Sequence, residues 1–547
     1  MTDCPRDLRV FLQRLEERGM LYRYGDPINK DTELYPFFRV QQRGLPDEAR
    51  RALLFQNVVG AKGNHYDWSV FPGAYAASEA MLMVGFGCES YQEGLERWHM
   101  ARAHPIDPVV VVDGPVHENV MMGDDLKRVG LDILPVPVEE PGFSAVLRLG
   151  LPIITRDPVT GVRNVGTYNA FLKARDRLQA AIGPGAHAMA YHWKTARERH
   201  EPLPVAIIIG PDLPTMGASS ASLPYGVDEL AVASGFFGKP IELVRCKTVP
   251  LEVPAYAEAV VEGFMSTDTA EPRLPFGEFP GYMQSDMTVR PVLNVTAITY
   301  RNNAIFTPVL VGMPPSDTSM VWGFVHAGDQ LHHLKYEAGL PVEEVYYPQL
   351  GGGSTFCVVR MAESASPEDG QKVVDELSQR RGVAKITVVV DYDIDVRDAD
   401  TLIWALSFRT ARKRDYSFVA TNNGGLDPSG SPAGTGRGRM SAEGTEPDFT
   451  RVVINATRKW NYPPVALPRK PYMDRALELW ESRGDLPKPQ MRSPWYGYEL
   501  GFWSAELQRY ADMITAGEYL KLGDEMAELQ QPITDAMIGR NIDRSAG

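Results

Sequence analysis

One acidic residue, Glu278, lies in a short segment rich in glycine, proline and aromatic residues, PFGEFPGY at 275–282. A carboxyl group held among Phe276, Phe279 and Tyr282 would lose part of its hydration, which raises its pKa. A raised pKa suits a general acid that works near neutral pH. An ordinary exposed glutamate in a turn explains the segment equally well, so the local sequence leaves both interpretations open.

Three dispersed residues, Asn164, His187 and Glu229, offer the donor atoms of a metal site. An amide oxygen, an imidazole and a carboxylate suit Mn²⁺, Mg²⁺ or Fe²⁺ and leave coordination positions open for a phosphate. No local spacing rule links the three, and each alone is more often a structural polar residue than a ligand. The residues by themselves therefore do not decide between these roles.

Two further motifs are weaker candidates for a functional site. GTGRGR at 434–439 lacks the third glycine of a dinucleotide-binding loop at its proper place, and no clear strand precedes it. We expect a mobile surface or lid loop there, whose two arginines could reach a phosphate.

His332 and His333 are adjacent on a predicted helix, where neighbouring side chains point about 100° apart. They cannot share one metal ion as an i, i+4 pair does, and we expect a solvated or interface role.

The composition narrows the class of protein that carries these residues. The chain has 547 residues, with 56 Lys and Arg against 70 Asp and Glu, so its formal net charge is −14. That charge argues against a nucleic-acid or anionic-membrane partner. The cysteines form no CxxC pair, which favours a reducing, cytoplasmic compartment, and no apolar run is long enough to span a bilayer. We expect an acidic multidomain enzyme.

Periodicity predicts the elements that must position the candidate residues. Leucine and phenylalanine at helical spacing predict a helix from Leu8 that ends at Gly19. Runs of β-branched and aromatic residues predict strands over 203–210 and 293–300. Segments 170–182 and 227–236 are expected to be helical.

The second half of the chain predicts a connecting helix and an α/β region. PPSD at 314–317 combines a turn with a helix N-cap, so a helix should follow over 318–336. Predicted strands then alternate with predicted helices, which is typical of an α/β domain; the strands are 355–361 and 385–390 and the helices 373–380 and 400–408. The last 80 or so residues are expected to form loosely linked helices rich in aromatic residues.

A series of short elements occurs in a fixed order between residues 5 and 465. They are NVGTY (164–168), PVAIIIG (204–210), ASSASLPYGVDE (218–229), LEVPAYAEAVVEG (251–263), PFGEFPGY (275–282), YRNNAI (300–305), DYDIDV (391–396), WALSFR (404–409), and GSPAGTGRGRM followed by INATRKW. Taken together, they resemble the UbiD family of non-oxidative (de)carboxylases, which use prenylated FMN. No single element decides the resemblance, but their common order is specific.

The resemblance implies a multidomain chain of the α+β and α/β classes. Its expected parts are an N-terminal region with a split-β-barrel-like domain that binds prenylated FMN (1–312), a connecting helix (313–340) and an α/β oligomerisation domain (341–465). To these we add a helical C-terminal tail (466–547). The resemblance also implies a homodimer or homohexamer, and a flavin prenyltransferase that supplies the cofactor.

The resemblance also assigns cofactor-binding roles to individual residues. Its divalent-metal ligands (Mn²⁺ or Fe²⁺), which also hold the cofactor phosphate, correspond to Asn164, His187 and Glu229. His187 fits better than His192 because of its spacing to the following LPVAI segment. Ser219 and Ser220 correspond to the positions that line the flavin phosphate and a monovalent cation, K⁺. The basic residue that binds the phosphate corresponds to Arg380 or Arg381, and Arg409 corresponds to a position that supports this region.

The chain departs from the family at its catalytic triad of Glu, Arg and a second acid. The arginine that usually closes NVGxYR is Asn169 here, and the first acid is replaced by Arg273. Only the last acid, Glu278, is kept, and it is expected to be the proton donor. Because both partners of the ion pair are lost, neither charge is left buried alone, which indicates an active site with altered specificity and not a loss of activity.

These changes lead to three functional hypotheses. Arg273 places a bidentate cation where an acid used to lie, which favours a substrate with a second carbonyl or carboxylate, and Asn169 becomes a neutral pocket wall. The first hypothesis is therefore decarboxylation of an aromatic acid as its CoA thioester, as in phthaloyl-CoA decarboxylases. The second is turnover of a free aromatic or heteroaromatic acid, and the third a non-catalytic cofactor-binding subunit. The C-terminal tail could cover an acyl-CoA or dock at a subunit interface, and we favour the interface.

Overall fold

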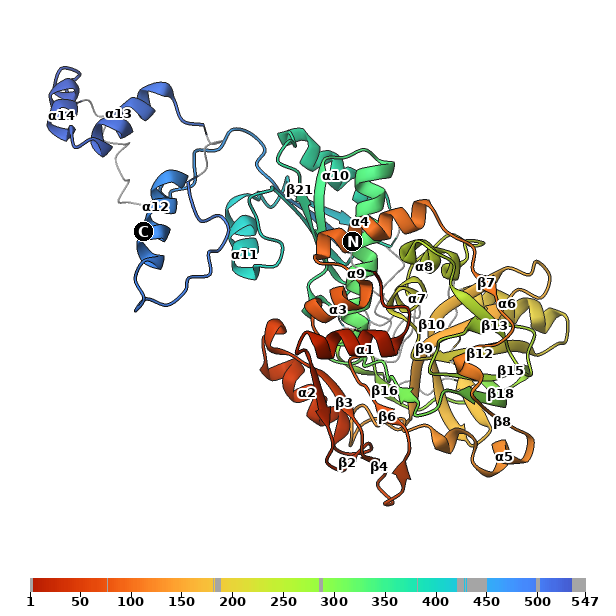
Figure 1. The fold of residues 1–547 in the computed structure, drawn as a ribbon. Helices are drawn as coiled ribbons and strands as arrows, with labels where there is room; N and C mark the ends of the chain where they lie inside the picture. Colours follow the sequence, from red (N-terminus) through yellow and green to blue (C-terminus); the bar gives the residue numbers. More distant parts are fainter. Residues whose placement is uncertain are drawn as a thin grey trace, which may run out of the picture. The chain divides into compact units, whose positions relative to one another are not determined.

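The computed structural model divides the chain into two compact units, Met1–Thr457 and Arg458–Gly547 (Figure 1). The residues that it describes are 3–75, 77–180, 182, 188–284, 289–380, 382–420, 427, 429, 450–497 and 502–533. The two units are treated separately below.

A closed barrel of antiparallel strands forms one side of the first unit (Figure 1). Its strand order is β11-β10-β9-β12-β15-β18, and pairing of β11 with β18 closes the ring. The bounds are β9 Arg148–Arg156, β10 Arg163–Ala174, β11 Arg177–Ala180, β12 Leu203–Ile209, β15 Ala259–Pro272 and β18 Val289–Tyr300. The expected split-β-barrel-like architecture is confirmed, as are the predicted strands at 203–210 and 293–300.

The predicted helix over 170–182 is wrong. The segment forms the end of β10 and then β11, which pairs with β10 on one side and β18 on the other. Its alanine, leucine and arginine residues have good helix propensity, but the sheet contacts outweigh it: Leu178 and Ala180 are completely buried in the barrel. The other helix expected in this region is confirmed as α8, Glu229–Phe237.

Helices and short strands surround the barrel. The first helix, α1 (Leu8–Glu17), is followed by Gly19 at φ +66°, as predicted. The other helices before the connecting helix are α2 Leu34–Gly44, α3 Glu79–Phe86, α4 Tyr91–Ala103, α5 Gly123–Arg128, α6 Ala188–Glu198 and α7 Leu213–Ala218. The short strands are β1 Leu21–Tyr24, β2 Ile28–Asn29, β3 Ala52–Phe55, β4 Val58–Val59, β5 His65–Tyr66, β6 Ser69–Val70, β7 Val109–Val110, β8 Asn119–Met122, β13 Glu242–Arg245, β14 Glu252–Pro254, β16 Phe276–Gly277, β17 Met283–Gln284 and β19 Ile305–Phe306.

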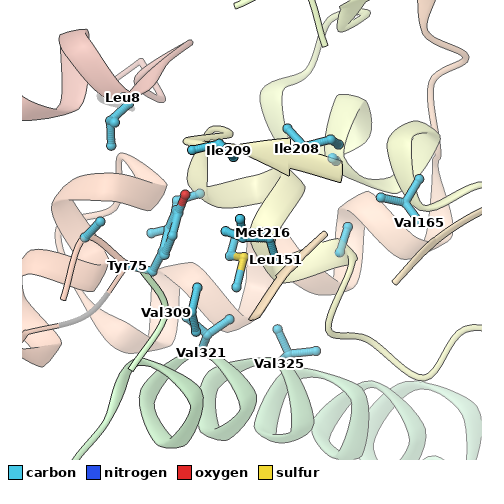
Figure 2. Close-up of a cluster of buried hydrophobic side chains, with 14 of the residues drawn as sticks. Leu8, Tyr75, Leu151, Val165, Ile208, Ile209, Met216, Val309, Val321 and Val325 are labelled. Carbon is cyan, nitrogen blue, oxygen red and sulfur yellow. The ribbon is translucent and has the colours of Figure 1, made fainter. Parts of the chain in front are cut away.

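The connecting helix packs against the barrel core. Helix α9 (Asp317–Leu331) starts at the N-cap Ser316, which confirms the cap read from PPSD, and continues as a π-helical segment, His332–Glu337. Figure 2 shows Val321 and Val325 of α9 beneath Met216 of α7 and the barrel residues Leu151 and Ile209. All five belong to one buried apolar cluster, so the helix is held to the barrel by hydrophobic contact.

A five-stranded sheet follows the connecting helix. Its order is β20-β21-β22-β24-β23, with bounds β20 Val342–Tyr346, β21 Phe356–Met361, β22 Ile386–Val390, β23 Tyr416–Val419 and β24 Arg451–Ala456. Strands β21 and β22 are parallel and are connected through α10 (Pro367–Gln379). Strands β22 and β24 are also parallel, and the chain between them forms α11 (Ala399–Phe408) and then β23. The predicted α/β alternation is confirmed.

The second unit contains three helices in its described part. They are α12 Lys470–Glu481, α13 Ala505–Thr515 and α14 Tyr519–Ala527, in line with the expected helical tail. Only Met513 among their residues is buried, and several large apolar side chains are exposed, including Trp480 and Leu520. Over the whole described chain, none of the helices combines the length and apolar character that a membrane crossing needs.

Candidate active site

Strand β10 brings two of the expected metal donors together. Asn164 is buried on this strand, and the N–H of the next residue, Val165, donates a 2.9 Å hydrogen bond to the Glu229 carboxylate. Glu229 is the first residue of α8, whose N-cap is Asp228. Arg163, on the other side of Asn164, donates to the Asp228 carboxylate at 2.6 Å. Strand and helix are thus joined by one hydrogen bond on each side of Asn164.

Burial acts most strongly on the Glu229 carboxyl group, and the nearby charge of Arg163 opposes it only weakly. Burial raises its pKa to about 7, although the Val165 N–H stabilises the ionised form. A divalent cation beside this carboxylate would favour its ionised form and offset the cost of burial. The chemistry of Glu229 and Asn164 therefore fits a metal ligand pair.

A set of hydroxyl groups meets the same strand three residues further along. The hydroxyl of Thr167 on β10 is 2.9 Å from that of Ser219 and 3.2 Å from that of Ser220. Both serine hydroxyls donate to the Met216 carbonyl at the end of α7. The predicted phosphate- and cation-lining serines thus meet the strand that carries Asn164, and their oxygens are suited to a monovalent cation or a phosphate.

The third expected metal donor, His187, lies outside the described residues, as does Arg381. Within the described part of the chain, no group of three His, Cys, Asp or Glu side chains is placed to hold a metal ion. The alternative histidine, His192 on α6, is completely buried, and its Nδ1 lies 2.9 Å from the Thr155 hydroxyl. Thr155 is the cross-strand neighbour of Asn164, so His192 lies close to the donor pair.

Glu278 lies in a tight hairpin turn between β16 and β17. Its N–H donates to the Tyr282 carbonyl, and its carbonyl accepts the N–H of Gly281. The next residue, Phe279, packs its ring on Trp322 of α9, with the ring centroids 5.4 Å apart. Phe276 is also buried, whereas Tyr282 is exposed. The connecting helix thus supplies an aromatic neighbour to this turn.

An ion pair that the sequence analysis missed lies beside this turn. Arg148, the first residue of β9, donates from Nε to one carboxylate oxygen of Glu139 at 2.7 Å and from Nη2 to the other. The same guanidinium donates from Nη1 to the Asn169 side-chain oxygen at 3.4 Å. Asn169, expected to be a neutral pocket wall, therefore contacts a buried cation.

Two arginines and burial act on the Glu278 carboxyl group. Burial raises its pKa, while the charges of Arg148 and Arg273 lower it and that of Glu139 raises it. Arg273 is buried, with its guanidinium carbon 5.1 Å from the centre of the Phe276 ring. The outcome is a raised pKa, as a general acid near neutral pH requires.

A third acid, Glu140, lies against the same turn. A Cβ atom placed on Gly277 would come within 2.1 Å of the Glu140 carboxylate, so glycine is needed for this close approach. Burial raises the pKa of Glu140. The sequence signal for Glu139, Glu140 and Arg148 was weak, because EE at 139–140 and RLGLP at 148–152 match no chemical motif.

The remaining predicted residues lie elsewhere. Arg409 forms buried ion pairs with Asp391 and Asp393 in the C-terminal sheet region, where its described contacts support that region and not the β10 cluster. Arg380 ends α10. His332 contacts His99 on α4, with 2.7 Å between their Nδ1 atoms, and His333 bridges to Glu337 and Glu376. His332 also pairs with Glu337, at 3.2 Å, so the two adjacent histidines share this carboxylate while their other partners differ.

Two family models match this chain and identify its family. The model of the 3-octaprenyl-4-hydroxybenzoate carboxy-lyase Rift-related domain, UbiD, matches residues 109–314. The model of the C-terminal domain of the same carboxy-lyase matches residues 319–456. The chain belongs to the UbiD family. UbiD proteins are carboxy-lyases, which confirms the expectation of an enzyme of this class.

Individual similar proteins match most of the chain. An uncharacterized protein of Aquifex aeolicus strain VF5 is 28% identical over 515 residues, which are 88% of this chain and 99% of that protein. An evolved dimeric form of the UbiD-class enzyme HmfF from Pelotomaculum thermopropionicum, in complex with prFMN, has a TM-score of 0.71 and 25% identity, covering 86% of this chain and 99% of that one. The apo 3,4-dihydroxybenzoic acid decarboxylase of Enterobacter cloacae shares the fold, with a TM-score of 0.71, 24% identity and coverage of 86% and 99%.

Proposed function

We propose that this UbiD protein decarboxylates an aromatic carboxylic acid with prenylated FMN, and that Glu278 delivers the proton that replaces the carboxylate. The observation that carries the proposal is the Glu278 carboxyl group, desolvated in an aromatic turn and flanked by Arg148 and Arg273. Burial raises the pKa of this group, as a general acid near neutral pH requires, and the two cations stabilise the carboxylate that remains after the proton is transferred.

The cofactor would be held at the other cluster on β10. Asn164, Glu229 and His187 would bind a divalent ion, Mn²⁺ or Fe²⁺, and through it the cofactor phosphate. Thr167, Ser219 and Ser220 would supply oxygens for K⁺ or for the phosphate itself. Prenylated FMN, when bound, supplies the electron sink that carbon dioxide loss requires. A flavin prenyltransferase would supply it, and a homodimer or homohexamer is the proposed assembly.

Two substrate forms remain as proposals. A CoA thioester such as phthaloyl-CoA is favoured by Arg273, whose buried cation would orient a second carbonyl or carboxylate beside the scissile one. A free aromatic acid is favoured by Arg148, because a buried guanidinium beside Asn169 replaces the positive charge that the sequence lacks at position 169. A free acid would therefore meet a buried cation beside position 169, where the family has its arginine.

The test of the proton donor is Glu278→Gln in protein loaded with the prenylated cofactor. We expect carbon dioxide release to fall at least about 100-fold, the usual contribution of a general acid, while the flavin content stays unchanged. Glu140→Gln, in the acid beside Gly277, is the matched control and should keep most of the activity. Undiminished release by Glu278→Gln would show that the assignment is wrong.

The substrate form is tested by comparing phthaloyl-CoA with free phthalate and with benzoate-type and pyrrole-type acids. Faster turnover of any free acid would overturn the thioester proposal. Turnover of phthaloyl-CoA alone would overturn the free-acid proposal.

A further inference from the structure

The register of strands β9 and β10 places Arg148 and Asn169 on one face of the barrel wall. Asn169 lies opposite Gly150, and Gly150 and Arg148 are two residues apart on the same strand, so their side-chain directions agree. A Cβ atom on Gly150 would lie 3.3 Å from the Asn169 oxygen and 4.0 Å from an Arg148 terminal nitrogen. The missing side chain of Gly150 therefore leaves the space in which the guanidinium reaches Asn169.

Arg148 is held in one orientation by partners on two sides. Its side chain is 3% exposed and that of Glu139 is 6% exposed, and the two form a two-pronged ion pair. Glu139 in turn accepts a hydrogen bond from the N–H of Val311 at 3.4 Å. A planar guanidinium bound by a carboxylate on one edge and by Asn169 on another keeps little freedom to turn.

The same guanidinium faces the turn that carries Glu278. Its central carbon lies 5.8 Å from the centre of the Phe276 ring, two residues before Glu278. Among the described residues, the charged groups with the largest effect on Glu278 are Arg148, Arg273 and Glu139, and Glu140 lies against the adjacent Gly277. The proton donor of the proposed function thus lies in a set of three acids and two arginines.

We propose that Arg148 is the positioning residue for Glu278: anchored by Glu139 and Asn169, it supplies from the neighbouring strand the positive charge that position 169 lacks, and it sets how tightly Glu278 holds its proton. The inference rests on the proposed role of Glu278 as proton donor. It assigns the Glu–Arg–acid arrangement in this chain to Glu139, Arg148 and Glu278.

Arg148 is a better candidate for this role than Arg273. Of the two cations, it lowers the pKa of Glu278 more. It also starts a barrel strand and donates to two side chains, those of Glu139 and Asn169. Glu139 opposes Arg148 at Glu278, so removing one or the other should move the proton affinity of Glu278 in opposite directions. A purely structural ion pair would not produce that pattern.

The experiment titrates Glu278 directly in the purified full-length protein without cofactor. Infrared spectra of each protein minus its Glu278→Gln counterpart isolate the carboxyl band of Glu278 as a function of pH. Arg148→Gln should raise the proton affinity of Glu278 about tenfold or more, and Glu139→Gln should lower it. Arg148→Lys, which keeps the charge, should stay closer to the wild type than Arg148→Gln.

A transplant variant makes the test specific. Arg148→Gln combined with Asn169→Arg restores the cation at position 169 and should bring the Glu278 titration back to within about threefold of the wild type. If Arg148→Gln fails to fold, Arg148→Gln with Glu139→Gln removes both charges and spares an unpaired buried acid. This double variant should still raise the proton affinity of Glu278, because Arg148 acts on it more strongly than Glu139 does.

Arg301→Gln is the matched control, since Arg301 also forms buried ion pairs, with Glu258 and Asp7, outside the Glu278 cluster. It should lower stability and leave the Glu278 titration unchanged. An unchanged titration in folded Arg148→Gln, or in the double variant, would overturn the proposal. The readout needs no substrate, so a failure of Glu278 as proton donor would appear separately, as undiminished decarboxylation by Glu278→Gln.

Discussion

The N–H of Val165 donates a 2.9 Å hydrogen bond to the carboxylate of Glu229. The bond joins barrel strand β10 to the first residue of α8 and fixes Glu229 beside Asn164. Because the donor is a backbone group, the arrangement depends on the course of the chain and not on the side chain at position 165. The two proposed metal donors are therefore positioned before any metal binds.

The first prediction concerns divalent metal. Mn²⁺ should raise the unfolding temperature of the purified protein, because a ligand that binds only the folded state stabilises it. Glu229→Gln and His187→Asn should each abolish most of that shift, measured by thermal unfolding with and without Mn²⁺. Glu252→Gln is the control, since this nearby carboxylate is already paired with Arg163. An equal Mn²⁺ shift in Glu229→Gln would contradict the ligand assignment.

The second prediction concerns the stability cost of Glu278. Its pKa is raised in the folded state by burial, so the folded protein holds this proton more tightly than the unfolded chain. The contribution of Glu278 to stability is therefore full below its unfolded pKa and is lost as pH rises toward the folded value. We expect the free energy of unfolding of Glu278→Gln, measured by chemical unfolding and taken relative to that of the wild type, to be higher at pH 8 than at pH 4.5. The difference should be about 1.4 kcal/mol for each unit by which the folded pKa exceeds the unfolded pKa. A constant difference between the two proteins would argue against a raised pKa.

The third prediction concerns His192, whose pKa is lowered to about 4 by burial. In the unfolded chain this imidazole binds a proton near pH 6.5, whereas in the folded protein it stays neutral until about pH 4. The free energy of unfolding therefore falls as pH drops from about 6.5 to about 4. The loss from this residue alone should reach up to about 3 kcal/mol. His192→Gln should remove that part of the acid sensitivity, measured as the difference between the two proteins in urea unfolding at pH 7 and pH 4.5. Parallel curves would mean that His192 titrates normally.

The fourth prediction concerns the proposed boundary of the C-terminal tail. The two buried apolar clusters of the described chain consist entirely of residues of the first unit. A chain ending at residue 465 should therefore fold with an unfolding temperature within a few degrees of the full-length protein. Circular dichroism and thermal unfolding test this expectation, and an unfolded product would show that the tail is part of the core. Size-exclusion chromatography of the same pair tests whether the tail takes part in oligomerisation.

Much of this protein follows from local sequence. The spacing of Leu8, Phe11 and Leu12 predicts α1, the PPSD segment predicts the cap of α9, and the alternation after residue 341 predicts the α/β sheet. These signals are local because a helix face, a cap or a turn involves residues that are close in the chain. The order of the motifs was likewise enough to identify the family.

The closure of the barrel and the surroundings of Glu278 were decided only by tertiary structure. Segment 170–182 has helical propensity, yet it completes the barrel because β11 finds partners in β10 and β18. Likewise, Asn169 and Arg273 indicated a lost triad, whereas strand register places Arg148 beside Asn169 and near Glu278. Arg148 is far from both in sequence, and a charge acts through space, so only the pairing of the strands determines which cation the proposed proton donor faces.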